Sequence, residues 1–135
     1  MEKILIIDDD KINSKIIARI VEDLGLVALQ CANGKQGWEA LCENDDIAYV
    51  LTDMLMPDMD GRELVYLIRY HEKFKDLPVL VISGVFSSEE LGGILEISPS
   101  NTFFLAKPVD ANNLRTHIEK LRKARATEGK EVIQA

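Results

Sequence analysis

The sequence has few of the residues from which disulfide frameworks, zinc sites and thiol redox centres are built. Only two of its 135 residues are cysteines, Cys31 and Cys42, and they form neither a Cys-x-x-Cys pair nor a Cys/His cluster. This scarcity argues against a metal-thiolate or redox protein. We expect both thiols to be reduced and partly buried.

Long hydrophobic runs are also missing. The apolar run near the N-terminus, residues 4–7, is far shorter than the roughly 20 residues of a membrane-spanning helix. It is also too short for the core of a signal peptide. We therefore expect a cytoplasmic protein with no membrane partner.

Positive charge is in deficit, with 16 Lys and Arg residues against 23 Asp and Glu residues, a formal net charge of −7 and a pI near 4.8. Proteins that bind nucleic acids neutralise phosphates with clustered Lys and Arg, so we expect no nucleic-acid partner. Apolar residues make up 47% of the chain and charged residues 29%, which is the balance of a folded globular protein. The length suits one domain.

Five short apolar runs that are rich in β-branched residues predict strands. They lie at residues 3–7, 27–31, 47–52, 79–82 and 102–106. The runs at 4–7 and 79–82 are hydrophobic throughout, which is typical of parallel strands covered on both faces.

Segments with helical spacing separate these runs. The clearest spans residues 12–24 and is followed by Gly25, which suits a helix C-terminus. Weaker helical patterns lie at 36–42, 62–70 and 110–123, and Asp110 is the expected N-cap of the last.

A further helix is predicted between the fourth and fifth strands. Ser87 and Glu90 form a capping box that would open this helix at Ser88. Gly92 and Gly93 have low helix propensity, so we expect the helix to be short or distorted, and mobile.

Strands that alternate with helices form βαβ units and therefore a parallel sheet with helices on both faces. We predict a three-layer, doubly wound α/β fold for a single domain at residues 1–123. Residues 124–135 are predicted to form a polar C-terminal tail, which is too short for a second domain.

In open α/β sheets, ligands bind beyond the carboxyl ends of the strands. The polar residues there are Asp8, Asp9 and Asp10 after the first strand, Asp53 after the third, Ser83 after the fourth and Lys107 after the fifth. Asp10 also suits the start of the following helix.

Carboxylates about 4 Å apart repel by roughly 4 kcal/mol at an effective dielectric of about 20, so the cluster of strand-end aspartates calls for a cation. Mg²⁺ prefers such oxygen ligands, and Lys107 and Ser83 could bind a phosphoryl group.

Four motifs occur in order along the chain: Ile-Ile-Asp-Asp at 6–9, Asp-Met-Leu-Met-Pro-Asp-Met-Asp-Gly at 53–61, Val-Ile-Ser-Gly at 81–84 and Lys-Pro at 107–108. Together they resemble the receiver domains of two-component response regulators, over residues 3–123. The resemblance implies a flavodoxin-like sheet of five strands in the order 2-1-3-4-5. It also implies a stand-alone phosphorelay module similar to the chemotaxis regulators.

The resemblance implies a role for each strand-end residue. Asp53 would be the phosphoacceptor, receiving its phosphoryl group from the phosphohistidine of a sensor histidine kinase or a histidine phosphotransfer protein. Asp9 and Asp53 would ligate Mg²⁺ together with the backbone carbonyl of Leu55, and Asp8 would act through water or as a second ligand. Lys107 would pair with a phosphoryl oxygen.

The resemblance also implies a switch. Ser83 would move to hydrogen-bond the phosphoryl group, and Phe104 would turn inward after it, although plain core packing is the alternative for Phe104. The bond between Lys107 and Pro108 is expected to be cis. The protein would then act on a downstream protein by contact, catalysing only its own phosphotransfer and slow dephosphorylation.

Two positions that tune phosphoryl lifetime in receivers are apolar in this chain. They are Leu55, two residues after the phosphoacceptor, and Val85, two residues after Ser83. Faster members often carry groups that position the attacking water at these places. We therefore hypothesise that a phosphoryl group on Asp53 is long-lived in this protein.

Three alternatives stay open at this point. The chain could be a receiver domain excised from a larger response regulator or hybrid kinase. It could be a phosphohydrolase resembling the haloacid dehalogenases, which need the motif Asp-x-Asp-x-Thr or Val. Asp8 and Asp10 match its two aspartates, but Ile12 stands at the last position. It could also be a pseudo-receiver that is not phosphorylated, a use that would not require this set of strand-end groups.

Overall fold

Strands and helices alternate along the chain. The computed structural model describes residues 1–84, 88–97 and 100–134. Within these residues the elements are β1 (Lys3–Ile7), α1 (Lys11–Asp23), β2 (Val27–Cys31), α2 (Gly34–Glu43), β3 (Ile47–Asp53), α3 (Gly61–Arg69), β4 (Val79–Ser83), α4 (Ser88–Ile97), β5 (Thr102–Ala106) and α5 (Ala111–Gln134). The five predicted strands are confirmed, and β3 and β4 each extend one residue further, through Asp53 and Ser83.

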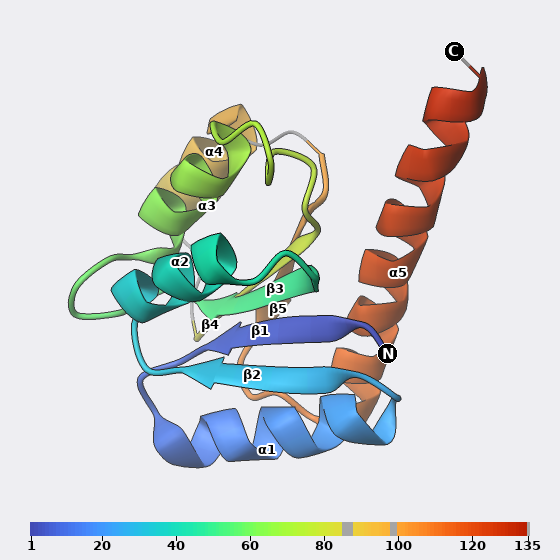
Figure 1. Ribbon diagram of the computed structural model, residues 1–135. Helices are drawn as coiled ribbons and strands as arrows, with labels where there is room; N and C mark the ends of the chain where they lie inside the picture. The colour runs from blue at the N-terminus through green and yellow to red at the C-terminus, as the bar shows by residue number, and fades with distance from the viewer. Residues whose placement is uncertain (85–87, 98–99, 135) are drawn as a thin grey trace.

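The strands form one parallel sheet in the order β2-β1-β3-β4-β5. Figure 1 shows α1 and α5 on one face of this sheet and α2, α3 and α4 on the other. The three-layer, doubly wound α/β fold and its strand order are therefore confirmed. The strand order reverses between β1 and β3, which is where ligands bind in sheets of this kind.

Each face of the sheet has its own hydrophobic core. In β1, Ile4 and Ile6 pack in the core that α1 and α5 cover, whereas Leu5 and Ile7 pack in the core beneath α2, α3 and α4. All four side chains are fully buried. Successive side chains of a strand point to opposite faces, so a strand that is covered on both sides must be hydrophobic throughout.

Three residues that were predicted to bound helices do so in the structure. Asp10 caps α1, because its carboxylate accepts a hydrogen bond of 3.0 Å from the N–H of Ile12. Asp110 does the same for α5 and accepts from the N–H of Asn113 at 2.8 Å. Gly25 follows α1 with a φ of +87°, a left-handed conformation that glycine adopts without strain.

The last helix is longer than predicted. We expected it to end at residue 123, but α5 continues through the segment interpreted as a polar tail and ends at Gln134. Polar residues are compatible with a helix, so polar composition is a poor signal for where a helix ends. Two arginines near the start of this segment contact the rest of the domain. Arg122, which precedes the segment, donates to the carbonyl of Leu24 at 2.7 Å, and Arg125 pairs with the carboxylate of Glu2 at 3.1 Å. No helix of the described residues is both long and apolar enough to cross a membrane.

The glycines of α4 do not shorten it. The helix begins at Ser88, as predicted, and continues through Gly92 and Gly93 to a length of ten residues, the same as α2. Ile94 is fully buried in the core beneath α2, α3 and α4, and such packing can offset low helix propensity. Ser87 of the predicted capping box lies outside the described residues.

The two cysteines differ in exposure. Both are free thiols, but Cys31 is half-buried and Cys42 is exposed. The prediction that both are partly buried was therefore wrong for Cys42. Its neighbour Leu41 is fully buried, and adjacent residues of a helix point in different directions, so Cys42 faces away from the core.

Two helical glycines allow a matched test of this packing. We expect Gly92→Ala to raise the free energy of unfolding by up to about 1 kcal/mol, because a Cβ there meets no neighbouring atom and alanine is the better helix former. Gly37→Ala should instead lower it by about 1 kcal/mol, because its Cβ would clash with the buried side chain of Ile7. Urea denaturation of both variants measures the difference, and equal stability would contradict it.

Candidate functional site

Asp53 lies at the carboxyl end of β3, in the middle of the sheet. Asp53 is only 7% exposed, and it pairs in register with Ile82 on β4. The backbone on either side is fixed, because the N–H of Met54 donates to the carbonyl of Ile82 at 2.8 Å and the hydroxyl of Thr52 donates to the carbonyl of Asp53 at 3.0 Å. The Asp53 carboxylate is therefore held at the sheet edge.

Asp8 and Asp9 reach the same place from the end of β1, the strand next to β3. One carboxylate oxygen each from Asp8, Asp9 and Asp53 can be chosen so that all three lie within 4.8 Å of one another. Asp8 and Asp53 are buried, whereas Asp9 is exposed. The predicted convergence of the three acids at one sheet edge is confirmed.

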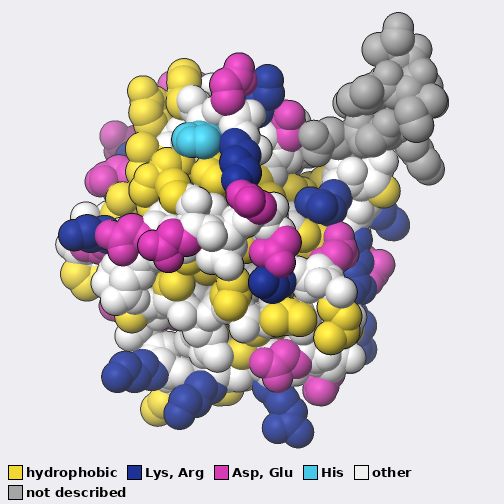
Figure 2. Space-filling model, viewed as in Figure 1, with side chains coloured by type: hydrophobic (Ala, Val, Ile, Leu, Met, Phe, Trp, Pro, Cys, Tyr) yellow, Lys and Arg dark blue, Asp and Glu magenta, His cyan; other side chains and the backbone are white. Residues whose placement is uncertain are grey.

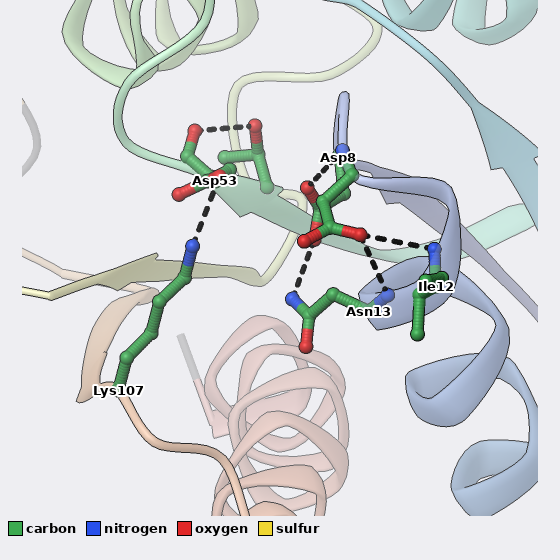
Figure 3. Close-up of polar contacts among 7 residues, drawn as sticks. Asp8, Ile12, Asn13, Asp53 and Lys107 are labelled. Atoms are coloured by element: carbon green, nitrogen blue, oxygen red, sulfur yellow. Dashed lines mark hydrogen bonds and ion pairs between the residues drawn. The ribbon is translucent and has the colours of Figure 1, made fainter.

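Asp8 is held by hydrogen bonds to both of its oxygens. One accepts from the N–H of Asp10 at 2.9 Å, and the other accepts from the side-chain amide of Asn13 at 2.6 Å. Figure 3 shows Asn13 extending from the first turn of α1 toward Asp8. This role of Asn13 was not predicted from the sequence. The available signal was its position in the first turn of the helix that Asp10 caps, five residues after Asp8.

Lys107 comes from the end of β5, on the far side of β4. Its ammonium nitrogen lies 3.2 Å from Oδ2 of Asp53. Figure 3 shows the Lys107 side chain pointing toward Asp53. Its backbone is fixed as well, because the N–H of Lys107 donates to the carbonyl of Ser83 at 2.8 Å. The peptide bond between Lys107 and Pro108 is cis, as expected.

The other residues singled out in the sequence surround this cluster. Ser83 is buried at the end of β4, directly after the residue that pairs with Asp53. Phe104 is half-buried on β5, where it pairs with Val81 and packs against the core beneath α2, α3 and α4. Leu55 follows β3 closely and is 68% exposed. Val85 lies outside the described residues.

Burial raises the pKa of the Asp53 carboxyl above its ordinary value, because desolvation penalises the charged form. The ammonium of Lys107 opposes this shift, and the negative charge of Asp8 adds to it. The site thus holds more negative charge than Lys107 balances. Three carboxylates at this spacing suit a hard cation such as Mg²⁺, which would relieve their repulsion.

The site as a whole offers a carboxylate nucleophile, carboxylate ligands for a divalent cation, a lysine and a neighbouring hydroxyl. These are the groups that transfer of a phosphoryl group to a carboxylate requires. Every group comes from the carboxyl end of a strand, so the parallel sheet itself brings them together.

Comparisons with known proteins agree with this geometry. A family described as the response regulator receiver domain matches residues 4–119. Chemotaxis protein CheY-3 of Vibrio cholerae is 32% identical over 120 residues, which cover 88% of this chain and 90% of that protein. Sensor histidine kinase CheAY of Helicobacter pylori is 31% identical over 119 residues, which cover 87% of this chain but only 14% of the kinase.

A solved structure shows the same fold. Chemotaxis protein CheY4 of Vibrio cholerae matches with a TM-score of 0.82 at 22% identity, covering 90% of this chain and 98% of that one. These matches favour the receiver over the phosphohydrolase alternative. The family match spans most of the chain and includes the strand ends that form the acidic cluster, so this chain belongs to the response regulator receiver domains, the phosphoacceptor signalling modules of two-component systems.

Proposed function

We propose that Asp53 is the phosphoacceptor and that a phosphohistidine of a cytoplasmic histidine kinase or histidine phosphotransfer protein is the donor. A carboxylate oxygen of Asp53 would attack the phosphorus, the P–N bond to the donor imidazole would break, and an acyl phosphate would form. The observation that carries this proposal is the meeting of Asp53 with Asp8, Asp9 and Lys107 at one sheet edge.

The acidic cluster fits Mg²⁺. Asp9 and Asp53 would ligate the ion directly with the backbone carbonyl of Leu55, and Asp8, whose two oxygens already accept hydrogen bonds, would act through water. When bound, Mg²⁺ would neutralise charge on the carboxylates and on the phosphoryl oxygens. Asn13 would act as a positioning residue, because it orients Asp8.

The remaining residues would respond to the acyl phosphate. Lys107, already 3.2 Å from Oδ2 of Asp53, would pair with a phosphoryl oxygen, and the hydroxyl of Ser83 on the adjacent strand would donate to another. Phe104 on β5 would be the switch aromatic. Dephosphorylation would be slow, because the apolar side chain of Leu55 cannot position a water molecule for attack.

The donor protein must approach Asp53 from the rim of the site. The elements that follow β1 and β3 carry three exposed apolar side chains: Ile12 and Ile16 on α1, which are 74% and 51% exposed, and Leu55 after β3. Figure 2 shows Lys and Arg side chains along α1 as well. Apolar side chains with Lys and Arg residues nearby suit a donor protein whose surface is apolar and flanked by acidic residues.

Labelling with a small phosphodonor tests the proposed function. We expect wild type to take up about one phosphoryl group per chain from acetyl phosphate in the presence of Mg²⁺, and Asp53→Asn to take up none. Asp58→Asn changes a neighbouring loop carboxylate and should label like wild type. Intact-mass spectrometry measures the uptake, and a chase without donor measures the decay. Labelling of Asp53→Asn, or catalytic phosphate release that depends on Asp8, would refute the proposal.

The raised pKa of Asp53 predicts how stability depends on pH in Mg²⁺-free buffer. Ionisation of Asp53 costs more in the folded than in the unfolded state, so wild type loses stability as the pH rises from the ordinary value of 3.8 through the raised pKa. Asp53→Asn lacks this cost. It should be the more stable protein at pH 7, and the difference should shrink toward pH 4, as measured by urea denaturation with EDTA.

Asp58 gives a control of opposite sign. The N–H of Lys35 donates to its carboxylate at 2.9 Å and lowers its pKa, so its ionisation favours the folded state. Asp58→Asn should therefore be slightly less stable than wild type at pH 7, with a loss that shrinks as the pH falls through the lowered pKa. A shift of the same sign for both variants would contradict the assignment.

Asn13 tests the support of the metal site. We expect Asn13→Ala to weaken Mg²⁺ binding about tenfold, because Asp8 loses the amide that orients it. Asn112→Ala, an exposed asparagine in the first turn of α5, should bind Mg²⁺ like wild type. Isothermal titration calorimetry measures both affinities. Equal affinities would show that Asp8 needs no such support.

A further inference from the structure

A groove lies between α3 and α4, outside the phosphoacceptor site. Its volume is about 570 Å³, and most of its lining is apolar. The residues that line it include Arg62, Glu63, Tyr66 and Leu67 on α3 and Gly93 and Glu96 on α4. None of these residues is used by the proposed phosphotransfer, so the groove is free for another role.

A glycine of α4 keeps this groove open. Gly93 lies opposite Arg62, and a Cβ added to it would come within 3.7 Å of Cδ of Arg62. A larger side chain would therefore extend into the groove. The preceding residue, Gly92, faces open space with no atom within 4 Å of an added Cβ. The two adjacent glycines thus provide a matched pair, in which only one lines the groove.

Two tyrosines form an exposed aromatic surface beside the groove. The rings of Tyr66 and Tyr70 stack on each other at 4.5 Å between centroids, and the residues are 49% and 70% exposed. Neither hydroxyl has a hydrogen-bond partner among the described residues. Figure 2 shows hydrophobic side chains gathered at the surface in this region. Stacked tyrosines are rigid and lose little entropy when a partner covers them, which suits a binding surface.

The charge around the groove is mostly negative. Three carboxylates, Asp60, Glu63 and Glu96, line it, against the single guanidinium of Arg62. Arg62 is already paired with Asp60 at 3.5 Å. In the part of the chain that the structure describes, Glu63 and Glu96 have no ion-pair partner. The rim therefore complements a positively charged partner.

Both walls of the groove are attached to the phosphoacceptor site. At the start of α3, the N–H of Gly61 donates at 2.7 Å to the carbonyl of Met54, the residue after Asp53. At the other wall, α4 begins at Ser88, shortly after β4 ends at Ser83. Both helices that line the groove are therefore connected along the chain to strand ends of the phosphoacceptor site.

We propose that this groove binds an amphipathic helix of a downstream protein, with an aromatic or aliphatic anchor in the groove and Lys or Arg residues on either side of it. The apolar lining takes the anchor, the tyrosine pair covers its flank, and Glu63 and Glu96 pair with the basic residues. The coupling of this binding to signalling rests on the proposed phosphorylation of Asp53.

Selection from a displayed library of randomised helical peptides tests the groove. Wild type, loaded with beryllofluoride and Mg²⁺, is the target, and Gly93→Leu is used for counter-selection. We expect the enriched peptides to carry an apolar anchor flanked by Lys or Arg. Enrichment of acidic peptides, or no enrichment, would overturn the proposal. So would self-association of wild type that Gly93→Leu abolishes, because a second copy would then be the occupant.

Matched variants locate the binding of an enriched peptide, measured by fluorescence anisotropy. Its affinity should fall about tenfold in Gly93→Leu and in Glu63→Lys, which removes a rim charge without filling the groove. Gly92→Leu and Glu39→Lys, an exposed glutamate on α2, should bind like wild type. Equal loss in Gly92→Leu and Gly93→Leu, or no loss in Glu63→Lys, would overturn the assignment.

Two further measurements separate this inference from the proposed function. Gly93→Leu should take up a phosphoryl group from acetyl phosphate like wild type. If wild type is labelled at Asp53 but binds no peptide in the groove, only the groove proposal is overturned. Removing beryllofluoride should change the peptide affinity about fivefold or more. An unchanged affinity would overturn the coupling, whereas absence of labelling at Asp53 would overturn the proposed function.

Discussion

Burial of two like charges side by side is the constraint on which this site depends. Asp8 and Asp53 are both buried at one sheet edge, where their carboxylates repel each other and lose hydration. The structure offsets this cost with donors aimed at each acid: Lys107 at Asp53, and the backbone of Asp10 with the amide of Asn13 at Asp8. The offset is incomplete, and the site is therefore suited to a cation and a phosphoryl group.

The hydrophobic sheet makes that arrangement possible. Each acid follows a strand whose side chains are buried on both faces, so the strand end has little freedom to move away from its neighbours. Hydrogen bonds between adjacent strand ends add to this, as in the pair from Met54 to Ile82 and the pair from Lys107 to Ser83. The sheet therefore places the three carboxylates and Lys107, and Asn13 of α1 adds support to Asp8.

Most of the fold and the acidic cluster could be predicted from the sequence, because both depend on patterns local to each strand. Continuous hydrophobicity identified the buried strands, and the polar residue after each strand identified the site. Asn13 was missed because its role depends on how α1 leaves the sheet, which no local pattern records. The length of α5 was missed because its last residues are mostly polar, and the groove beside Gly93 depends on how two helices pack.

The two-sided burial of β1 has a consequence for the tolerance of this chain to insertions and deletions. Ile4 and Ile6 face one core and Leu5 and Ile7 face the other, with no polar face between them. Loss of one residue within this strand would exchange the side chains between the two cores and draw Asp8 away from Asp53. Length changes are tolerable in the loops at the opposite ends of the strands, whereas the length of β1 is fixed by packing and chemistry together.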